Sequence, residues 1–242
     1  MQVTLRVLIG YDPREDDAYQ VCRASLLRHS SVPLHVQGLH LPALREAGLY
    51  RRPWRMENGQ RYDEIDGRPF STDFSFSRFL VPALCQYEDW ALFVDCDFLF
   101  MADVAELAAY MDPAKAVVVC QQRHEPAAGV KMDAQIQTRY RRKNWSSFML
   151  FNNGHPATRR LTVDAVNREP GSWLHQFDWL KDSEIGNLPA SWNWIDGVTR
   201  EAPKAVHYTE GGPWFPEYGD VAYAREWKRE AARPAALGAR AA

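Results

Sequence analysis

Asp95 and Asp97 are the residues whose type and spacing point most directly to chemistry. They are separated by one residue and stand between two apolar runs, Trp-Ala-Leu-Phe-Val at 90–94 and Phe-Leu-Phe at 98–100. Burying two anions among apolar side chains costs free energy unless a cation neutralises them. A divalent metal would supply that cation, with the two carboxylates as oxygen ligands and the oxygens of a diphosphate completing its coordination. Aspartates that cap a following helix are the alternative, and the cost of an uncompensated pair favours the metal.

A histidine in a second segment suits the same metal. His207 ends a short apolar run at 205–206, and the turn Gly211-Gly212-Pro213 follows it. Glycines allow the backbone to approach a phosphate closely, so this turn is a candidate for diphosphate binding. An imidazole together with two carboxylates suits Mn²⁺ better than Mg²⁺. A lone histidine is more often structural, and we expect a ligand here because of the two aspartates.

The elements that must position these residues follow an α/β pattern. A strand at 3–9, a helix at 15–27 and a strand at 33–41 form the start of a βαβ unit, and hence of a parallel sheet. The near-continuous apolar run 90–94 is typical of a strand buried on both faces. Ligands of open α/β sheets bind outside the carboxyl ends of the strands, which is where the two aspartates would stand.

The rest of the chain continues this alternation. The turns Asn58-Gly59 and Asp66-Gly67 predict a small hairpin. The other predicted elements are strands at 116–120, 145–151 and 205–208, a helix that starts at Thr72 or Asp73 and continues through Leu84, and helices at 157–166, 173–180 and 221–231. We expect one domain over residues 1–231 and a disordered tail over 232–242.

Composition excludes several classes of function. The 242 residues carry a formal net charge of −2, without the basic excess of a nucleic-acid binder. The four cysteines stand singly with no CxxC pair, which argues against a zinc site and a disulfide framework and indicates a reducing compartment. No apolar stretch approaches the roughly 20 residues of a membrane helix, and the first residues do not read as a signal peptide. We therefore expect a cytoplasmic protein without a transmembrane segment.

Five segments, taken in order, carry a resemblance to one enzyme family. Besides the Asp-x-Asp pair and the late His-Tyr-…-Pro-Trp turn, they are Ser-Arg-Phe-Leu at 77–80, Ser-Ser-Phe-Met-Leu-Phe-Asn at 146–152 and Leu-Pro-Ala-Ser-Trp-Asn at 188–193. Together they resemble the retaining nucleotide-sugar glycosyltransferases of the GT-A fold, especially family 8, with glycogenin and the bacterial galactosyltransferases. The resemblance implies an α/β fold with a Rossmann-like, mixed and mostly parallel sheet flanked by helices. It also implies metal-dependent transfer of a sugar, with retention, from a UDP-sugar donor to a glycan or other hydroxyl acceptor.

The resemblance further implies roles for individual residues. Asp95, Asp97 and His207 would bind the metal, and the two aspartates would also hold the donor diphosphate through it. The other implied donor contacts are Tyr11 and Asp12 for uracil and ribose, Arg78 for the phosphate or sugar, and Gly211 and Gly212 for the diphosphate; the implied acceptor contacts are Trp192, Asn193 and Trp214. Indoles can stack on sugars, but with nine tryptophans in the chain core packing is the alternative.

The first departure from the family's pattern lies in its Asp-Gln-Asp segment, which is read here as His-Gln-Phe-Asp at 175–178. Asp178 stands for the last aspartate and is our candidate for orienting the acceptor or the donor sugar. A surface aspartate near Lys181 is an equal alternative. The glutamine that lies near the reacting carbon falls on Phe177, or on Gln176 after a shift of one residue.

The second departure is that Gly212 occupies the place of the family's diphosphate lysine. Arg78 or a residue of the basic run within 139–143 could supply this cation, although a solvated surface is the alternative for that run. Both departures indicate a divergent branch, and a nucleotide-sugar-binding protein that has lost catalysis would explain them. A haloacid-dehalogenase-type phosphohydrolase also has a strand ending in Asp-x-Asp, but near its N-terminus. A nucleotidyltransferase would need a Gly-rich phosphate loop, which does not follow the first strand here.

Overall fold

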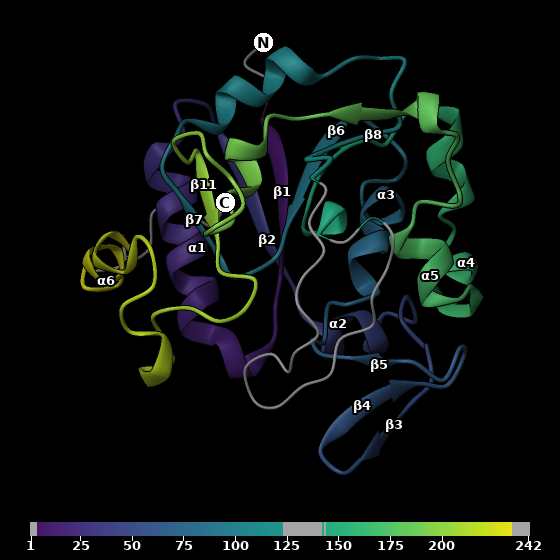
Figure 1. Cartoon of the computed structure of the whole chain (residues 1–242). Coiled ribbons are helices and arrows are strands. Elements are labelled where there is room, and N and C mark those ends of the chain that lie inside the picture. Colours follow the sequence, from purple (N-terminus) through teal and green to yellow (C-terminus); the bar gives the residue numbers. More distant parts are fainter. Residues whose placement is uncertain (1–3, 123–141, 143, 234–242) are drawn as a thin grey trace.

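A six-stranded sheet forms the centre of the molecule, with strands in the order β10-β8-β9-β6-β1-β2 (Figure 1). The computed structural model describes residues 4–122, 142 and 144–233. The strands are Leu5–Gly10 (β1), Leu34–Leu39 (β2), Trp90–Val94 (β6), Val117–Val119 (β8), Phe148–Asn152 (β9) and Ile185–Asn187 (β10). Among these six strands only β9 runs antiparallel to its neighbours, whereas the pairs β1–β2, β1–β6 and β8–β10 are parallel. The predicted mixed, mostly parallel sheet is confirmed.

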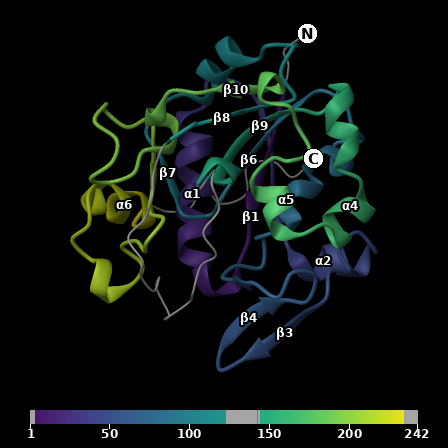
Figure 2. The same ribbon diagram turned by 45° about the vertical axis from the view of Figure 1, so that its right-hand side comes forward.

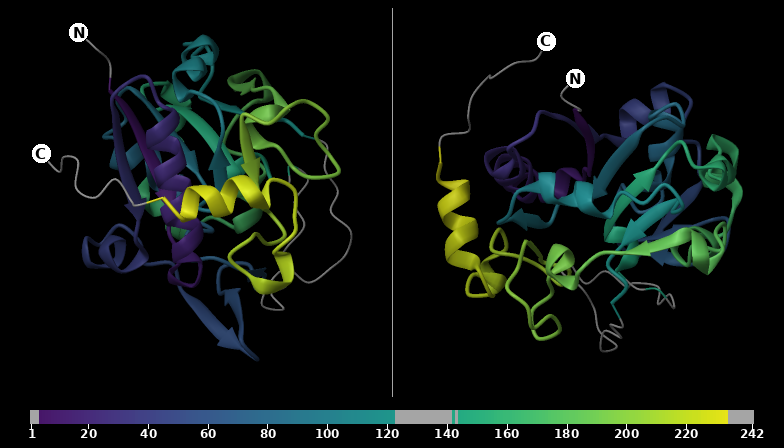
Figure 3. Two further views of the ribbon diagram at one scale, coloured as in Figure 1. Left: turned by 90° about the vertical axis from the view of Figure 1, so that its left-hand side faces the viewer. Right: turned by 90° about the horizontal axis from the view of Figure 1, so that it is seen from above.

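Helices cover both faces of this sheet, which explains the apolar runs of its central strands. Helix α1 (Asp16–His29) lies on one side, and α4 (Val163–Arg168) and α5 (Gly171–His175) lie on the other (Figures 1 and 3). Ala91, Leu92, Phe93 and Val94 of β6 are all completely buried. A strand covered on both faces has no polar face to present to water, so its side chains need not alternate in polarity.

A small second sheet stands beside α1 and carries one of the predicted ligands. Its two antiparallel strands are β7 (Phe98–Phe100) and β11 (Ala205–His207). Helix α1 packs against β7 and against α6 (Ala224–Ala231), which crosses α1 in the left view of Figure 3. Arg28 of α1 forms an ion pair of 2.6 Å with the buried Glu230 of α6. Helix α6 thereby supports the layer that holds β7 and β11.

The predicted hairpin is present as an antiparallel ribbon of β3 (Trp54–Glu57), β4 (Gln60–Asp63) and β5 (Pro69–Phe70), which projects from the body (Figure 2). Asn58 and Gly59 form its turn with φ values of 50° and 77°, a conformation that asparagine and glycine tolerate best. Arg52 ties the ribbon to α4. Its guanidinium pairs with Asp63 at 2.7 Å and donates to the carbonyls of Val166 and Glu169.

Several helices differ from the sequence-based predictions. The helix predicted from Thr72 or Asp73 is wrong at its start: Ser77–Leu80 forms a 3₁₀-helix without a side-chain cap and continues into α3 (Val81–Leu84). The Thr72 hydroxyl bonds to Ser75 instead. The other helical segments within the described residues are α2 (Leu41–Glu46) and the 3₁₀-helices Pro13–Glu15, Val104–Tyr110, Trp145–Ser147, Pro156–Arg160, Asp182–Glu184, Ala190–Asn193 and Pro216–Tyr218.

Two backbone positions with positive φ shorten the other predicted helices. The helix predicted at 173–180 ends at His175, because Phe177 has φ 57°. The helix predicted at 221–231 begins only after Tyr223, which has φ 60°. All four cysteines are free and buried, in agreement with the expected lack of disulfides. Among the described helices, none has the length and apolar character needed to cross a bilayer. Most of the predicted tail, residues 234–242, lies outside the described residues.

Candidate metal and donor site

Asp95, Asp97 and His207 meet at one place, as the sequence predicted. One ligand atom from each of the three side chains lies within 4.8 Å of the others. Asp95 and Asp97 follow the carboxyl end of β6. His207 reaches them because β11 pairs with β7, which puts His207 opposite Phe98, and because the Tyr208 amide donates to the Asp97 carbonyl at 3.0 Å. The long-range pairing of two short strands therefore assembles the cluster.

The three side chains are close to buried, which fits a bound cation. The exposed fractions of the side chains are 12% for Asp95, 10% for Asp97 and 1% for His207. His207 Nε2 faces Asp97 Oδ1 at 3.4 Å. Two carboxylate oxygens and an imidazole nitrogen are a donor set that divalent metals of the Mn²⁺ type accept. These residues therefore fit a metal of that kind.

Arg78, predicted to contact the donor, lies in the same cluster beside Asp95. Its Nη1 stands 2.8 Å from Asp95 Oδ1, and the guanidinium also donates to the carbonyls of Phe74 and Ser146. The side chain is almost completely buried and packs its guanidinium over Phe93. A cation fixed by three acceptors is preorganised, so it loses little freedom when an anionic ligand arrives.

Asn193 has a different place from the one predicted. It is completely buried, its Oδ1 lies 2.8 Å from His207 Nδ1, and its Nδ2 donates to the Asn144 carbonyl at 3.0 Å. In this structure the amide offers no surface to an acceptor sugar, which differs from the predicted acceptor contact. The ring of His207 is held on its face by Phe98, with ring centroids 4.4 Å apart and an angle of 10° between the planes.

Trp192 likewise presents no surface to an acceptor in this structure. Its indole is completely buried and packs against Phe148 at a centroid distance of 6.0 Å. Trp214 differs from it, because it is half-buried and packs at a tilt against Trp227, with ring centroids 5.8 Å apart. Core packing, the alternative noted for the indoles, therefore holds for Trp192, and Trp214 keeps an exposed part.

The two glycines of the late turn make room for aromatic rings. A Cβ on Gly212 would come within 1.9 Å of the Trp214 ring, and a Cβ on Gly211 within 2.7 Å of Tyr218. Gly211 also has φ 137°, which disfavours other residues. The sequence suggested glycines for close approach to a phosphate, and the structure adds a packing reason for both positions.

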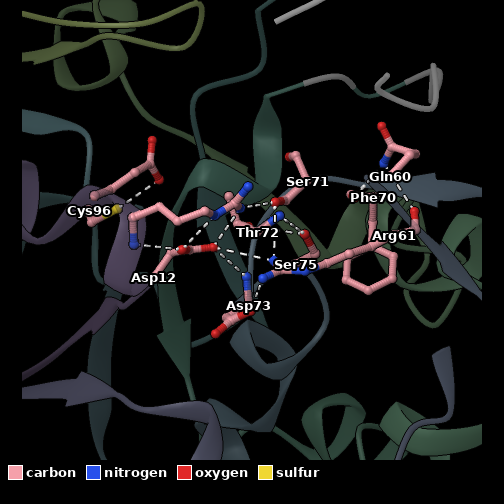
Figure 4. A network of polar contacts seen from close by, with 11 residues as sticks. Asp12, Gln60, Arg61, Phe70, Ser71, Thr72, Asp73, Ser75 and Cys96 are labelled. Atoms are coloured by element: carbon pink, nitrogen blue, oxygen red, sulfur yellow. Dashed lines mark hydrogen bonds and ion pairs between the residues drawn. The ribbon is translucent and has the colours of Figure 1, made fainter. Parts of the chain in front are cut away.

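Tyr11 and Asp12 stand at the carboxyl end of β1, next to β6, but the Asp12 carboxylate is occupied by neighbours (Figure 4). It accepts hydrogen bonds from the Arg14 guanidinium at 2.8 and 3.0 Å and from the Asp73 amide at 3.1 Å, and Arg61 Nη1 lies 3.4 Å away. Burial raises the pKa of Asp12, but the hydrogen bonds and charge of Arg14 outweigh it, so the pKa is lowered. Asp12 is thus an ionised anchor for two arginines.

The Tyr11 ring is half-buried and lies against His40 at a centroid distance of 4.2 Å. Its hydroxyl donates to Asp16 Oδ1 at 3.1 Å, and this hydrogen bond, followed by burial, raises the pKa of Tyr11. Tyr11 therefore offers a partly accessible aromatic face beside the Asp12 network.

The residues of the segment 175–178 lie in different environments, from the core to the surface. Phe177 is completely buried and packs against Phe79 and Trp179. Asp178 is exposed, as the surface alternative expects, and Gln176 is half-buried with its carbonyl accepting from Arg142 at 2.9 Å. Arg142 also pairs with Asp182; the other residues of the basic run lie outside the described residues.

His175 was not among the predicted site residues, yet the structure connects it to the cluster. Its Nδ1 lies 2.9 Å from Ser146 Oγ, and the carbonyl of the same Ser146 accepts from Arg78, which pairs with Asp95. The only sequence signal was its position at the start of the divergent Asp-Gln-Asp segment. If the family's glutamine is read on Gln176, His175 takes the place of the first aspartate, and an imidazole replaces a carboxylate there.

Solved structures of known proteins share this fold. The chain superposes on the WbbM bifunctional glycosyltransferase with a TM-score of 0.63 and 13% identity, covering 96% of this chain and 50% of that one. For the glycosyltransferase GlyE of Streptococcus pneumoniae the TM-score is 0.59 with 16% identity, over 96% of this chain and 61% of that one. The galactosyltransferase LgtC, solved with donor and acceptor sugar analogs, gives 0.56 with 12% identity over 94% and 95% of the two chains. The protein has the GT-A glycosyltransferase fold.

The sequence comparison leads to a more particular relative. No family model matches the chain. Protein CDI of Arabidopsis thaliana is 46% identical over 232 residues, which cover 93% of this chain and 85% of that protein. The chain belongs to the same family as Protein CDI.

Proposed function

We propose that this protein is a metal-dependent glycosyltransferase. It would transfer a hexose from a nucleotide-sugar, with UDP-sugars the expected donors, to a hydroxyl acceptor with retention, and residues 1–231 would form its single catalytic domain. The observation that carries the proposal is the convergence of Asp95, Asp97 and His207 beside Arg78, at the carboxyl end of β6 in a GT-A fold. Ligands of open α/β sheets bind at this edge.

The reaction breaks the bond between the anomeric carbon and the diphosphate, so negative charge develops on the diphosphate oxygens. A divalent metal, with Mn²⁺ favoured over Mg²⁺, would act there as a Lewis acid held by Asp95, Asp97 and His207. Arg78 is fixed by Asp95 and two carbonyls and would add a second, preorganised positive charge. The leaving phosphate could accept the proton of the acceptor hydroxyl, so no separate base is required.

The remaining residues have proposed roles at the two ends of the site. Tyr11 presents an aromatic face for the base, while Asp12 holds Arg14 and Arg61 beside it. The backbone of Gly211 and Gly212 borders the diphosphate. On the acceptor side, Trp214 offers its exposed part, and Asp178 or Gln176 orients sugar hydroxyls.

A second candidate is a nucleotide-sugar-binding protein of the same fold without catalysis. The specific observation in its favour is that Phe177, at the position read as the family's reactive-centre glutamine, is completely buried. Gly212 in place of the diphosphate lysine points the same way. The GT-A fold gives no support to the haloacid-dehalogenase alternative.

Calorimetric titration of UDP with Mn²⁺, and then with EDTA, tests the binding step in the wild type and in Asp97→Asn. Asp112→Asn is the matched control. Asp112 is exposed and lies before the amino end of β8, whereas Asp97 lies beyond the carboxyl end of β6. We expect Mn²⁺-dependent binding that Asp97→Asn loses and Asp112→Asn retains. Release of UDP from labelled UDP-sugars then separates the two candidates. Turnover supports the glycosyltransferase, whereas binding without turnover for any acceptor favours the non-catalytic binding protein. If neither UDP nor any other nucleotide binds, with Mn²⁺ or with EDTA, both candidates are wrong.

A further inference from the structure

The side-chain amide of Asn193 lies between a backbone carbonyl and the imidazole of His207. Nδ2 is 3.0 Å from the Asn144 carbonyl oxygen, and Oδ1 is 2.8 Å from His207 Nδ1. A carbonyl can only accept a hydrogen bond, so the amide nitrogen of Asn193 must face Asn144. The amide oxygen consequently faces His207, and the orientation of this side chain follows from its chemistry.

The orientation of Asn193 determines which nitrogen of His207 carries the hydrogen. An amide oxygen has no hydrogen to donate, so Nδ1 of His207 must be the donor across the 2.8 Å contact. In the neutral imidazole the lone pair is then on Nε2, the atom that faces Asp97 Oδ1 at 3.4 Å. The opposite tautomer would place two lone pairs against each other at 2.8 Å in a completely buried contact, at a substantial free-energy cost.

The backbone keeps Asn193 at this position. Trp194, the next residue, donates its amide to the Ala205 carbonyl, and the His207 amide donates to the Trp194 carbonyl, at 2.9 and 2.8 Å. The segment carrying Asn193 therefore runs alongside β11 in a fixed register. Phe98 covers a face of the imidazole ring, which restricts its rotation further.

We propose that Asn193 is a positioning residue that fixes the tautomer and direction of His207, so that Nε2 presents its lone pair to a divalent cation between His207 and the two aspartates. The proposal rests on the proposed metal site. Partners behind a ligand histidine orient the ring, and their loss typically weakens metal binding by about 10–100-fold. Asn193 contacts Nδ1 of His207, whereas Nε2 faces Asp97, so Asn193 acts through His207.

Nuclear magnetic resonance of ¹⁵N-histidine-labelled protein, without metal, tests the tautomer directly. The ring signals of His207 are assigned by their loss in His207→Gln. We expect Nδ1 protonated and Nε2 unprotonated in the wild type at a pH where the ring is neutral. Asn193→Leu, which removes the acceptor, should shift the ring towards Nε2 protonation. Asn193→Asp keeps an oxygen towards Nδ1 and should retain Nδ1 protonation, although its second oxygen faces the Asn144 carbonyl and should lower stability.

Asn153→Leu is the matched control for loss of a buried asparagine. Asn153 is also completely buried and its Nδ2 also donates to backbone carbonyls, those of Glu88 and Asp89, at the other end of the sheet. Both leucine variants should lose stability in urea unfolding, but only Asn193→Leu should change the His207 tautomer. A purely structural role for Asn193 predicts the same His207 signals in both variants.

Mn²⁺ titration provides the second readout. We expect the Kd to rise about 10–100-fold in Asn193→Leu and to stay within a few-fold of wild type in Asn193→Asp and Asn153→Leu. A wild-type His207 protonated on Nε2, or an Asn193→Leu variant with wild-type tautomer and Kd, overturns the proposal. If the wild type binds no Mn²⁺ while the tautomer responds as expected, the metal function is wrong and the control of the ring by Asn193 stands.

Discussion

Replacing Arg78 by methionine should weaken the fold. The guanidinium is bound to Asp95 and to two carbonyls, and the side chain is only 7% exposed. Removing one partner of a buried ion pair costs about 3–5 kcal/mol. Because the Asp95 side chain is 12% exposed and keeps some contact with water, we expect the free energy of unfolding to fall by the lower end of this range, about 3 kcal/mol. For a chain of this length the melting temperature should fall by about 6–12 °C.

The same substitution should strengthen metal binding. Arg78 and a bound metal would both be attracted by the negative charge of Asp95 and would repel each other. The metal should therefore bind more tightly when Arg78 is absent. Two unit charges about 4 Å apart have an interaction energy of ~1 kcal/mol in water and ~4 kcal/mol at an effective dielectric constant of 20. We therefore expect the Kd for Mn²⁺ to fall about fivefold or more. Sugar transfer should nevertheless decrease, because the proposed contact of Arg78 with the diphosphate is lost.

Arg52→Met is the matched control, since Arg52 is also a buried arginine and pairs with Asp63 rather than with a proposed ligand. Urea unfolding and calorimetric Mn²⁺ titration are measured for both variants. Both should lose stability, and only Arg78→Met should bind Mn²⁺ more tightly. An unchanged or higher Kd in Arg78→Met, with normal behaviour of the control, would refute the inference that Arg78 shares the charge of the metal site.

Three further outcomes are expected. Asp178→Asn should reduce transfer without changing UDP binding; activity equal to wild type removes Asp178 from the site. Gly212→Ala should destabilise the fold by about 1–3 kcal/mol in urea unfolding, because the new Cβ overlaps the Trp214 ring, and unchanged stability would show that the ring has room to move. The pKa of Asp12 is lowered mainly by Arg14 against the opposing effect of burial, so its stabilisation is complete above the unfolded pKa of about 3.9 and is lost as pH falls through the folded value. Asp12→Asn should therefore lose less stability than wild type between about pH 5 and pH 2, and equal acid sensitivity would contradict this assignment.

The sequence alone determined the central strands and the aspartate pair. Run 90–94 is apolar throughout, which is typical of a strand covered on both faces, and Asp95 follows it directly. The hairpin turn at Asn58 and Gly59 was equally predictable, because positive φ at two successive residues strongly favours these types. Helix ends were less predictable: Phe177 ends α5 in a conformation that disfavours phenylalanine, and its burial in the core compensates for this.

The tertiary structure decided how distant residues combine. Pairing of β7 with β11 brings His207 to Asp97, and the segment beside β11 places Asn193 behind His207 rather than on the acceptor side. The same packing buries Trp192 and leaves part of Trp214 exposed. Local patterns of polarity and turn residues reflect the backbone near each residue, so they are readable from sequence. Contacts between remote segments depend on the shapes and register of whole elements, and only the folded chain determines them.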